Sequence, residues 1–205
     1  TEVSEDLDRE EIQDEQDEPE LEETPVESDA ENVITTLDAD GNIASGVVEI
    51  NGGHVEWVID GDGKLTVTGE GDFQEANQSP WAQYVVPWEQ YKKEIRTAEV
   101  SLTGCKNAGG MFLNCSNLTD IDLSNFDTSQ VTDMRRMFSE CEKLKNLDLK
   151  NFNTSQAISM YDMFSGCTNL RNLDLSSFDT SQVTNMNSMF SECTNLKNLD
   201  LSSFS

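Results

Sequence analysis

Residues 131–152 read VTDMRRMFSECEKLKNLDLKNF, and residues 157–178 read AISMYDMFSGCTNLRNLDLSSF. The two stretches align without insertion at an offset of 26 residues, and the same offset aligns one further copy on each side. Each copy contains a Met-Phe pair, a Cys and an L-x-x-L-x-L pattern or a close variant of it. A further Met stands three residues before the pair in every copy except the first, where Ala108 replaces it. A fixed period of 20–29 residues with that leucine spacing is typical of leucine-rich repeats.

The aligned positions recur four times each. They are Phe112, Phe138, Phe164 and Phe190; Cys115, Cys141, Cys167 and Cys193; Leu118, Leu144, Leu170 and Leu196; and Leu123, Leu149, Leu175 and Leu201. One repeat cannot bury its own apolar face, so neighbouring repeats are expected to stack.

Two periodicities lie inside one repeat. Residues 120–124 alternate polar and apolar, which predicts a short strand with one buried face. A later run has the spacing of one helical stripe, and residues 127–129 before it are of the types that cap a helix. That run is Val131, Met134, Met137, Phe138 and Cys141. We therefore predict an α/β solenoid in which each coil is a short parallel strand, a turn and a short helix.

The segment before the repeats is predicted to be a β-hairpin and helical cap over residues 53–99. Residues 53–69 alternate around an Asp-Gly-Asp-Gly turn, as a hairpin does. Four aromatic residues follow, near two expected helical turns, and they either seal the end of the repeat core or stack on sugars; we favour the seal. These are Trp81, Tyr84, Trp88 and Tyr91.

Residues 1–31 carry 16 acidic residues and one basic residue, Arg9, so they hold −15 of the chain's net charge of −27. Like charges at this density, with few apolar residues among them, predict a disordered acidic tail over residues 1–32. Residues 33–52 are then a linker or first strand, and residues 100–205 are the repeats, truncated at their C-terminal end. The acidic balance disfavours nucleic acid as a partner, and no apolar run is long enough for membrane insertion.

The run from Trp57 to Gly71, followed by Ser79-Pro80-Trp81 and Lys92-Lys93-Glu94-Ile95, resembles the N-terminal module of BspA-like leucine-rich-repeat surface proteins. The repeat resembles that family's repeat, so the resemblance covers residues 53–205. It implies an exported bacterial protein of the cell surface or cell wall, used for adhesion or host contact. It implies no catalytic residue and no particular ligand.

The polar residues of the predicted strands form the candidate binding face, which we expect to be concave and to point away from the core. The face comprises Asp120, Asp122, Asn146, Asp148, Asn172, Asp174, Asn198 and Asp200. Stacked carboxylates repel one another and attract a counter-charge, which makes calcium or a cationic partner one hypothesis. The alternative is a solvated polar face in which each Asp bonds its neighbours, and we favour that interpretation.

The cysteines at 115, 141, 167 and 193 are not spaced as zinc ligands are, and they are expected to be small, inward-facing and unpaired. Cys105 is either free or paired with Cys115. Six methionines beside the phenylalanines are interpreted as core residues, not as a copper site. Residues 38–42 and 60–64 have some acids of a calcium loop. Ile43 stands where such a loop needs Gly, however, so both segments are interpreted as turns.

The sequence holds a single histidine, His54, and contains neither a G-x-S-x-G motif nor a phosphate-binding P-loop motif. We predict a non-enzymatic protein without cofactor that binds a host or neighbouring-cell protein or glycan. Two alternatives stay open: a structural stalk of a larger wall-anchored protein, and a calcium-dependent binder that uses the Asp ladder.

Overall fold

The computed structural model describes residues 37–50, 53–72 and 86–204. In chain order the elements are β1 (Asn42–Ile50), β2 (Gly53–Asp60), β3 (Lys64–Glu70), the 3-10 turn η1 (Glu89–Tyr91), β4 (Thr97–Thr103), β5 (Asp120–Asp122), β6 (Asn146–Leu147) and β7 (Asn172–Leu173). The predicted acidic tail, as well as Trp81 and Tyr84, lies outside the described residues.

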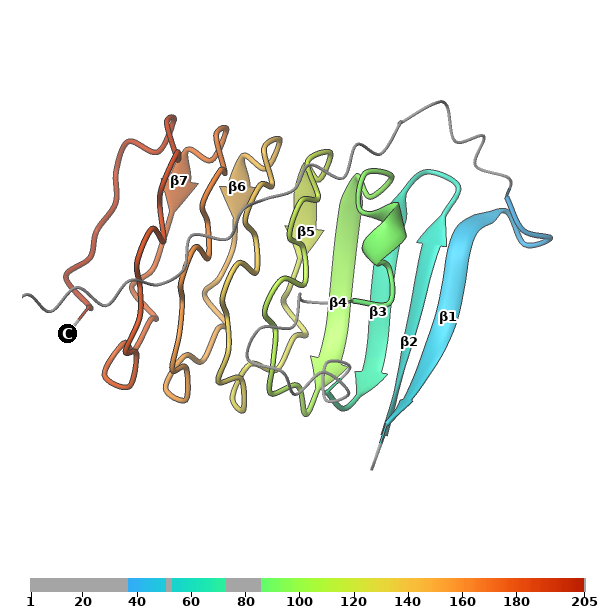
Figure 1. The fold of residues 1–205 in the computed structure, drawn as a ribbon, viewed down its shortest axis with the longest axis horizontal. Helices are drawn as coiled ribbons and strands as arrows, with labels where there is room; N and C mark the ends of the chain where they lie inside the picture. The colour runs from blue at the N-terminus through green and yellow to red at the C-terminus, as the bar shows by residue number, and fades with distance from the viewer. Residues whose placement is uncertain (1–36, 51–52, 73–85, 205) are drawn as a thin grey trace, which may run out of the picture. The chain divides into compact units, whose positions relative to one another are not determined.

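The first five strands form one sheet in the order β1-β2-β3-β4-β5, as Figure 1 shows. Strands β1, β2 and β3 are antiparallel neighbours, whereas β3 with β4 and β4 with β5 are parallel. Strands β6 and β7 pair in parallel as a separate two-stranded sheet. The chain thus changes from an antiparallel sheet to parallel stacking where the repeats begin.

The hairpin expected over residues 53–69 is present as β2 and β3. Its turn follows from Asp60, whose Oδ1 accepts the amides of Asp62 and Lys64, and from Gly63 at φ +82°. Alternate residues of both strands, such as Val55 and Leu65, are fully buried. Asp38 likewise accepts the amides of Asp40 and Asn42, so both acidic segments considered as calcium loops are turns.

The predicted α/β solenoid is wrong, because the repeats contain no helix. The structure is β-rich, and η1 is the one helical element among the described residues. Where a helix was expected, backbone amides donate to the next repeat instead of to their own turn: Phe112 N to Met137 O, Phe138 N to Met163 O and Phe164 N to Met189 O, at 2.9–3.0 Å.

A chain of β-turns gives the same spacing of inward-facing residues as a helix does. The amides of Met137, Ser139 and Cys141 donate to the carbonyl three residues earlier. Between them, Arg136 and Glu140 have φ of 54° and 60°, in the left-handed region that breaks a right-handed helix. Successive turns also present a side chain inward every third residue, so the apolar stripe is kept while the helix is not.

The core of the repeats is a set of columns of identical side chains. The rings of Phe112, Phe138, Phe164 and Phe190 are stacked nearly parallel, with centroids 5.7–5.8 Å apart. The first three are fully buried and Phe190 is only partly buried. Each ring therefore packs on copies of itself, which fixes the register between repeats.

Trp88 closes the core on the side of the N-terminal sheet. It is fully buried, its Nε1 donates to Met111 O at 3.0 Å, and its ring lies 6.3 Å from that of Trp57. Tyr91 packs on the same Trp57 ring at 6.2 Å. These two aromatics seal the core as expected, although they stand on a 3-10 turn and not in the predicted helical cap.

Candidate binding surfaces of the repeats

The eight residues of the predicted binding face are all exposed and lie along β5, β6, β7 and the bridge at Asn198. Between them, Ile121, Leu147 and Leu173 point into the core. The strand alternation expected from the sequence is therefore present, and it brings these eight side chains into one strip, which we call the Asp/Asn row. A binding role for the row stays a prediction.

The four aspartates at the ends of the strands hold a turn. Oδ1 of Asp122, Asp148, Asp174 and Asp200 accepts the amide two residues later, at 2.9–3.1 Å. These hydrogen bonds lower the pKa of all four carboxyls. The identity of this residue in every repeat is accounted for by the turn, without a ligand.

The row is hollowed at one place. A depression of about 660 Å³ brings together Asp174, Asn198 and Asp200 of the predicted face, and Lys197 lies beside them. The other members of the row lie outside it. No three carboxylate, thiol or imidazole groups of the described residues are arranged to hold a metal ion, so the calcium hypothesis gains no support there.

The cysteine column faces inward, as predicted, and all five cysteines of the chain are free. The thiols of Cys141, Cys167 and Cys193 each donate to the Phe carbonyl of the preceding repeat, at 3.1–3.2 Å. Burial raises the pKa of Cys115 and of Cys167 to about 12. These thiols stay protonated at neutral pH and are hydrogen-bond donors between repeats rather than nucleophiles.

A second ladder runs half a repeat away from the Asp/Asn row. Parallel bridges join Asn107 to Asp133, Asp133 to Ser159, and Ser159 to Asn185. The second and third residues after each bridge residue differ in every copy. They are Gly109-Gly110, Arg135-Arg136, Tyr161-Asp162 and Asn187-Ser188. We call these eight residues the variable strip.

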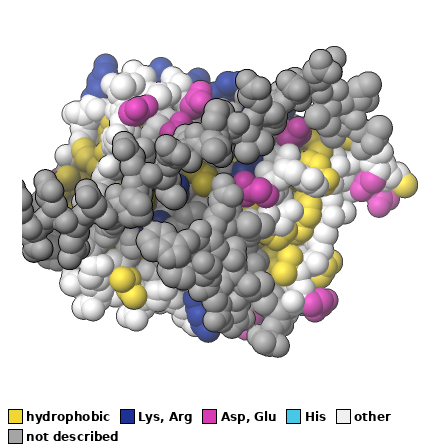
Figure 2. Space-filling view, viewed as in Figure 1, with side chains coloured by type: hydrophobic (Ala, Val, Ile, Leu, Met, Phe, Trp, Pro, Cys, Tyr) yellow, Lys and Arg dark blue, Asp and Glu magenta, His cyan; other side chains and the backbone are white. Residues whose placement is uncertain are grey.

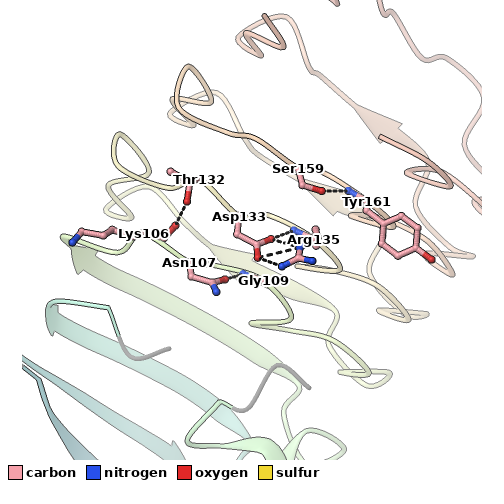
Figure 3. Close-up of polar contacts among 8 residues, drawn as sticks. All are labelled: Lys106, Asn107, Gly109, Thr132, Asp133, Arg135, Ser159 and Tyr161. Carbon is pink, nitrogen blue, oxygen red and sulfur yellow. Dashed lines mark hydrogen bonds and ion pairs between the residues drawn. The ribbon is translucent and has the colours of Figure 1, made fainter. Parts of the chain in front are cut away.

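The side chains of the variable strip are organised by neighbouring polar groups, as Figure 3 shows for part of it. Arg135 lies on Asp133, with Nη2–Oδ2 at 2.6 Å and Nε–Oδ1 at 3.0 Å. Arg136 reaches into the next repeat, where its Nε lies 3.2 Å from Asp162 Oδ2 and its guanidinium lies 5.4 Å from the centre of the Tyr161 ring. Ile158, beside this cluster in sequence, is 52% exposed. The result is a preorganised cluster of two guanidiniums and an aromatic ring.

The backbone of the variable strip favours glycine, yet the chain uses it in one copy only. Gly110, Arg136, Asp162 and Ser188 have φ of 61°, 54°, 55° and 55°. A left-handed conformation costs a non-glycine residue about 1–2 kcal/mol. Three repeats thus carry a side chain where the backbone would be more stable without one.

The variable strip cannot be found from the residues that repeat. The available signal was the opposite one: these positions change between copies whose other positions stay alike.

These features define a β-rich protein of stacked 26-residue repeats, with one uniform strand row and one variable strip. Residues 106–205 match a family model described as "Mycoplasma protein of unknown function, DUF285". The matched region contains all four repeats and none of β1 to β4. No curated protein and no solved structure matches the chain. Within the described residues, no helix has the length and apolar character needed to cross a membrane.

Proposed function

We propose that this chain is a non-enzymatic binding module of a bacterial surface protein, and that it binds a protein or glycan ligand through the variable strip. The observation that carries the proposal is the strip itself. Repeats that are otherwise alike differ at two adjacent positions, which are half-buried in the second and third repeats and exposed in the fourth, and three repeats keep a side chain in a conformation that favours glycine. Backbone strain of this kind tends to persist at functional sites.

The chemistry of the strip suits recognition. Tyrosine and arginine are residue types enriched at the centres of protein interfaces, and tyrosine supplies a large contact area at a low cost in conformational entropy. Arg135 and Arg136 are already held by carboxylates, so a ligand need not order them. Such a preordered surface lowers the entropic cost of binding.

Two observations support a role without catalysis. The single histidine, His54, is exposed on β2, and its nearest described carboxylate is Glu56 at 3.7 Å. The buried cysteines have raised pKa values and are engaged as thiol donors. The surface location rests on the resemblance of residues 53–205 to BspA-like proteins and is part of the proposal.

A glycan and extracellular-matrix protein array tests this function directly with the full chain. The matched variant is R136S/Y161N, because Ser188 and Asn187 already occupy the same places in the fourth repeat. We expect the full chain to bind a defined set of ligands and the variant to lose them while it stays folded. No ligand for the full chain, or equal binding by the variant, would count against the proposal.

The structural stalk remains the second candidate, and the uniform core favours it. Identical phenylalanine and cysteine columns with an unbroken hydrogen-bond ladder suit a rigid spacer. A spacer, however, gives no reason for the residues of the variable strip to differ from one repeat to the next. The same array separates the two, because a spacer predicts no ligand that depends on the variable strip.

A further inference from the structure

A ridge of basic side chains runs along the edge where the strands of the repeats begin. The residue just before each strand or bridge is Arg96 for β4, Thr119 for β5, Lys145 for β6, Arg171 for β7 and Lys197 for Asn198. Four of these five positions are basic. Parallel pairing of β4 with β5, of β6 with β7 and of Asn172 with Asn198 sets the strand starts of each pair side by side, about 4.8 Å apart. Figure 2 shows Lys and Arg side chains gathered along the upper edge of the view, where Figure 1 places these strand starts.

A second row lies next to the first. It contains Lys93, Asn117, Lys143, Asn169 and Asn195, two residues before the first row except at Lys93. Asn117 Nδ2 donates to Lys93 O at 2.7 Å, and Lys143 Nζ donates to Asn117 Oδ1 at 2.6 Å. We call the six basic residues of the two rows the basic ridge: Lys93, Arg96, Lys143, Lys145, Arg171 and Lys197.

The basic residues of the ridge differ from most other basic residues of the folded region in their ion pairing. All six of its side chains belong to exposed residues, and within the described part of the chain none forms an ion pair with a carboxylate. Of the basic residues outside the ridge in the described region, five are paired in this way: Lys64, Lys92, Arg135, Arg136 and Lys150. Cations therefore gather unneutralised on one edge of a chain whose net charge is −27.

We infer that the basic ridge is a binding site for a linear sulfated polysaccharide. A row of positive charges at the spacing of stacked strands matches a ligand whose negative charges lie along a line. Charges more than about 8–10 Å away are screened at physiological salt, so the ridge acts locally although the whole chain is acidic. Glu94 and Glu142 adjoin the ridge in sequence, and Asp174 and Asp200 line one depression with Lys197, so these carboxylates weaken the field of the ridge.

The amide row selects a sugar over other polyanions. Asn169 and Asn195 donate their Nδ2 groups to carbonyls of the preceding repeat, at 2.8 and 2.6 Å. Their Oδ1 atoms are therefore the groups that can accept hydroxyl donors, which sugars supply and a polyphosphate chain lacks. The two rows contain no aromatic residue, whereas single-stranded nucleic acid is usually held by stacking on aromatic rings.

The test measures binding of the full chain to dextran sulfate at low and at physiological salt, with uncharged dextran, polyphosphate and a single-stranded oligonucleotide alongside. The ridge variant is K145Q/R171Q/K197Q. The control variant, K64Q/K106Q/K150Q, removes the same charge outside the ridge. We expect the ridge variant to bind dextran sulfate about tenfold more weakly and with a smaller salt dependence, and the control variant to bind as the parent does.

Equal losses in the two variants would overturn the inference, because net charge alone would then set the affinity. So would an absence of binding to dextran sulfate, or unchanged binding by the ridge variant. Tighter binding of polyphosphate or of the oligonucleotide would replace the sugar with that ligand. None of these results bears on the variable strip, which neither variant alters.

Discussion

Individual side chains in this protein act as links between neighbouring repeats. The hydroxyl of Thr154 is buried and makes two such links: it donates to Asp179 O at 2.9 Å and accepts Asp179 N at 2.8 Å. Thr128 does the same with Asn153 one repeat earlier. A hydroxyl used twice between repeats explains why this position is threonine and not valine, which has the same shape.

Thr154→Val should therefore destabilise the fold by about 1–3 kcal/mol, since it leaves an amide and a carbonyl without their partner. The matched control is Thr184→Val. Thr184 is exposed and its hydroxyl only duplicates the bond that its own amide already makes to Ile158 O. Denaturant unfolding of both variants checks this, and a larger loss for Thr184→Val would contradict the role given to Thr154.

The cysteines should differ in reactivity according to burial. Cys193 is partly buried, whereas Cys115, Cys141 and Cys167 are buried, and burial raises the pKa of each of these thiols. We expect native-state alkylation, followed by mass spectrometry, to modify Cys193 first and the other three slowly. The denatured chain should show five free thiols. Fast modification of Cys141 would mean that the middle of the stack opens readily.

At the scale of elements, each strand of the repeats ends in a turn that an aspartate stabilises. Because hydrogen bonds lower the pKa of Asp122, Asp148, Asp174 and Asp200, their ionised forms favour the folded state. That contribution is complete above the ordinary carboxyl pKa of about 3.9 and is lost as the pH falls through the lower pKa of the folded state.

Replacing all four aspartates by asparagine should flatten this dependence. Asparagine Oδ1 still accepts the amide two residues later, but it does not titrate. We expect the parent to lose stability more steeply than the variant as the pH falls below about 4, measured by urea midpoints across a pH series. Parallel curves would show that these carboxylates bring no pH-dependent stability to the turns.

How far the sequence predicts these elements depends on the property in question. The 26-residue register, the buried faces, the β2–β3 hairpin and the inward cysteines follow from spacing and polarity alone. The absence of a helix in the repeats does not follow from them. The apolar residues of the run fit both a helical stripe and a chain of turns; they are Val131, Met134, Met137, Phe138 and Cys141. The choice depends on where the amides of 134–140 find acceptors, and for every second amide (134, 136, 138 and 140) the acceptor lies in the next repeat. The variable strip was missed because its residues differ from copy to copy, whereas the fold is inferred from positions that repeat.

At the scale of the whole folded region, stability should be unevenly distributed along the stack. The column phenylalanines occupy equivalent places, but Phe164 has a ring on each side and is fully buried. Phe190 is only partly buried, as are its neighbours Met186, Cys193 and Leu196 in the same repeat. Stability in stacked repeats is approximately a sum of single-repeat terms and nearest-neighbour interfaces.

Phe164→Ala should cost about 3–5 kcal/mol, as truncation of a buried phenylalanine usually does. Phe190→Ala should cost less, because its side chain loses fewer contacts. Chemical denaturation of both variants beside the parent measures the difference. Equal losses, or a larger loss for Phe190→Ala, would mean that another surface covers the last repeat in solution, for example in a dimer.

The central claim is that the variable strip, and not the Asp/Asn row, is the ligand-binding face. The most direct measurement is an equilibrium titration of one array ligand with three purified full chains: the parent, the strip variant R136S/Y161N and the row variant D148N/D174N. The strip variant uses residue types that the fourth repeat already has at those places, and in the row variant asparagine Oδ1 can still accept the turn amide. The account predicts that the strip variant binds at least about tenfold more weakly, which is the loss of one interface hot spot, while the row variant binds as the parent does. Loss of binding in the row variant, with the strip variant unchanged, would contradict it.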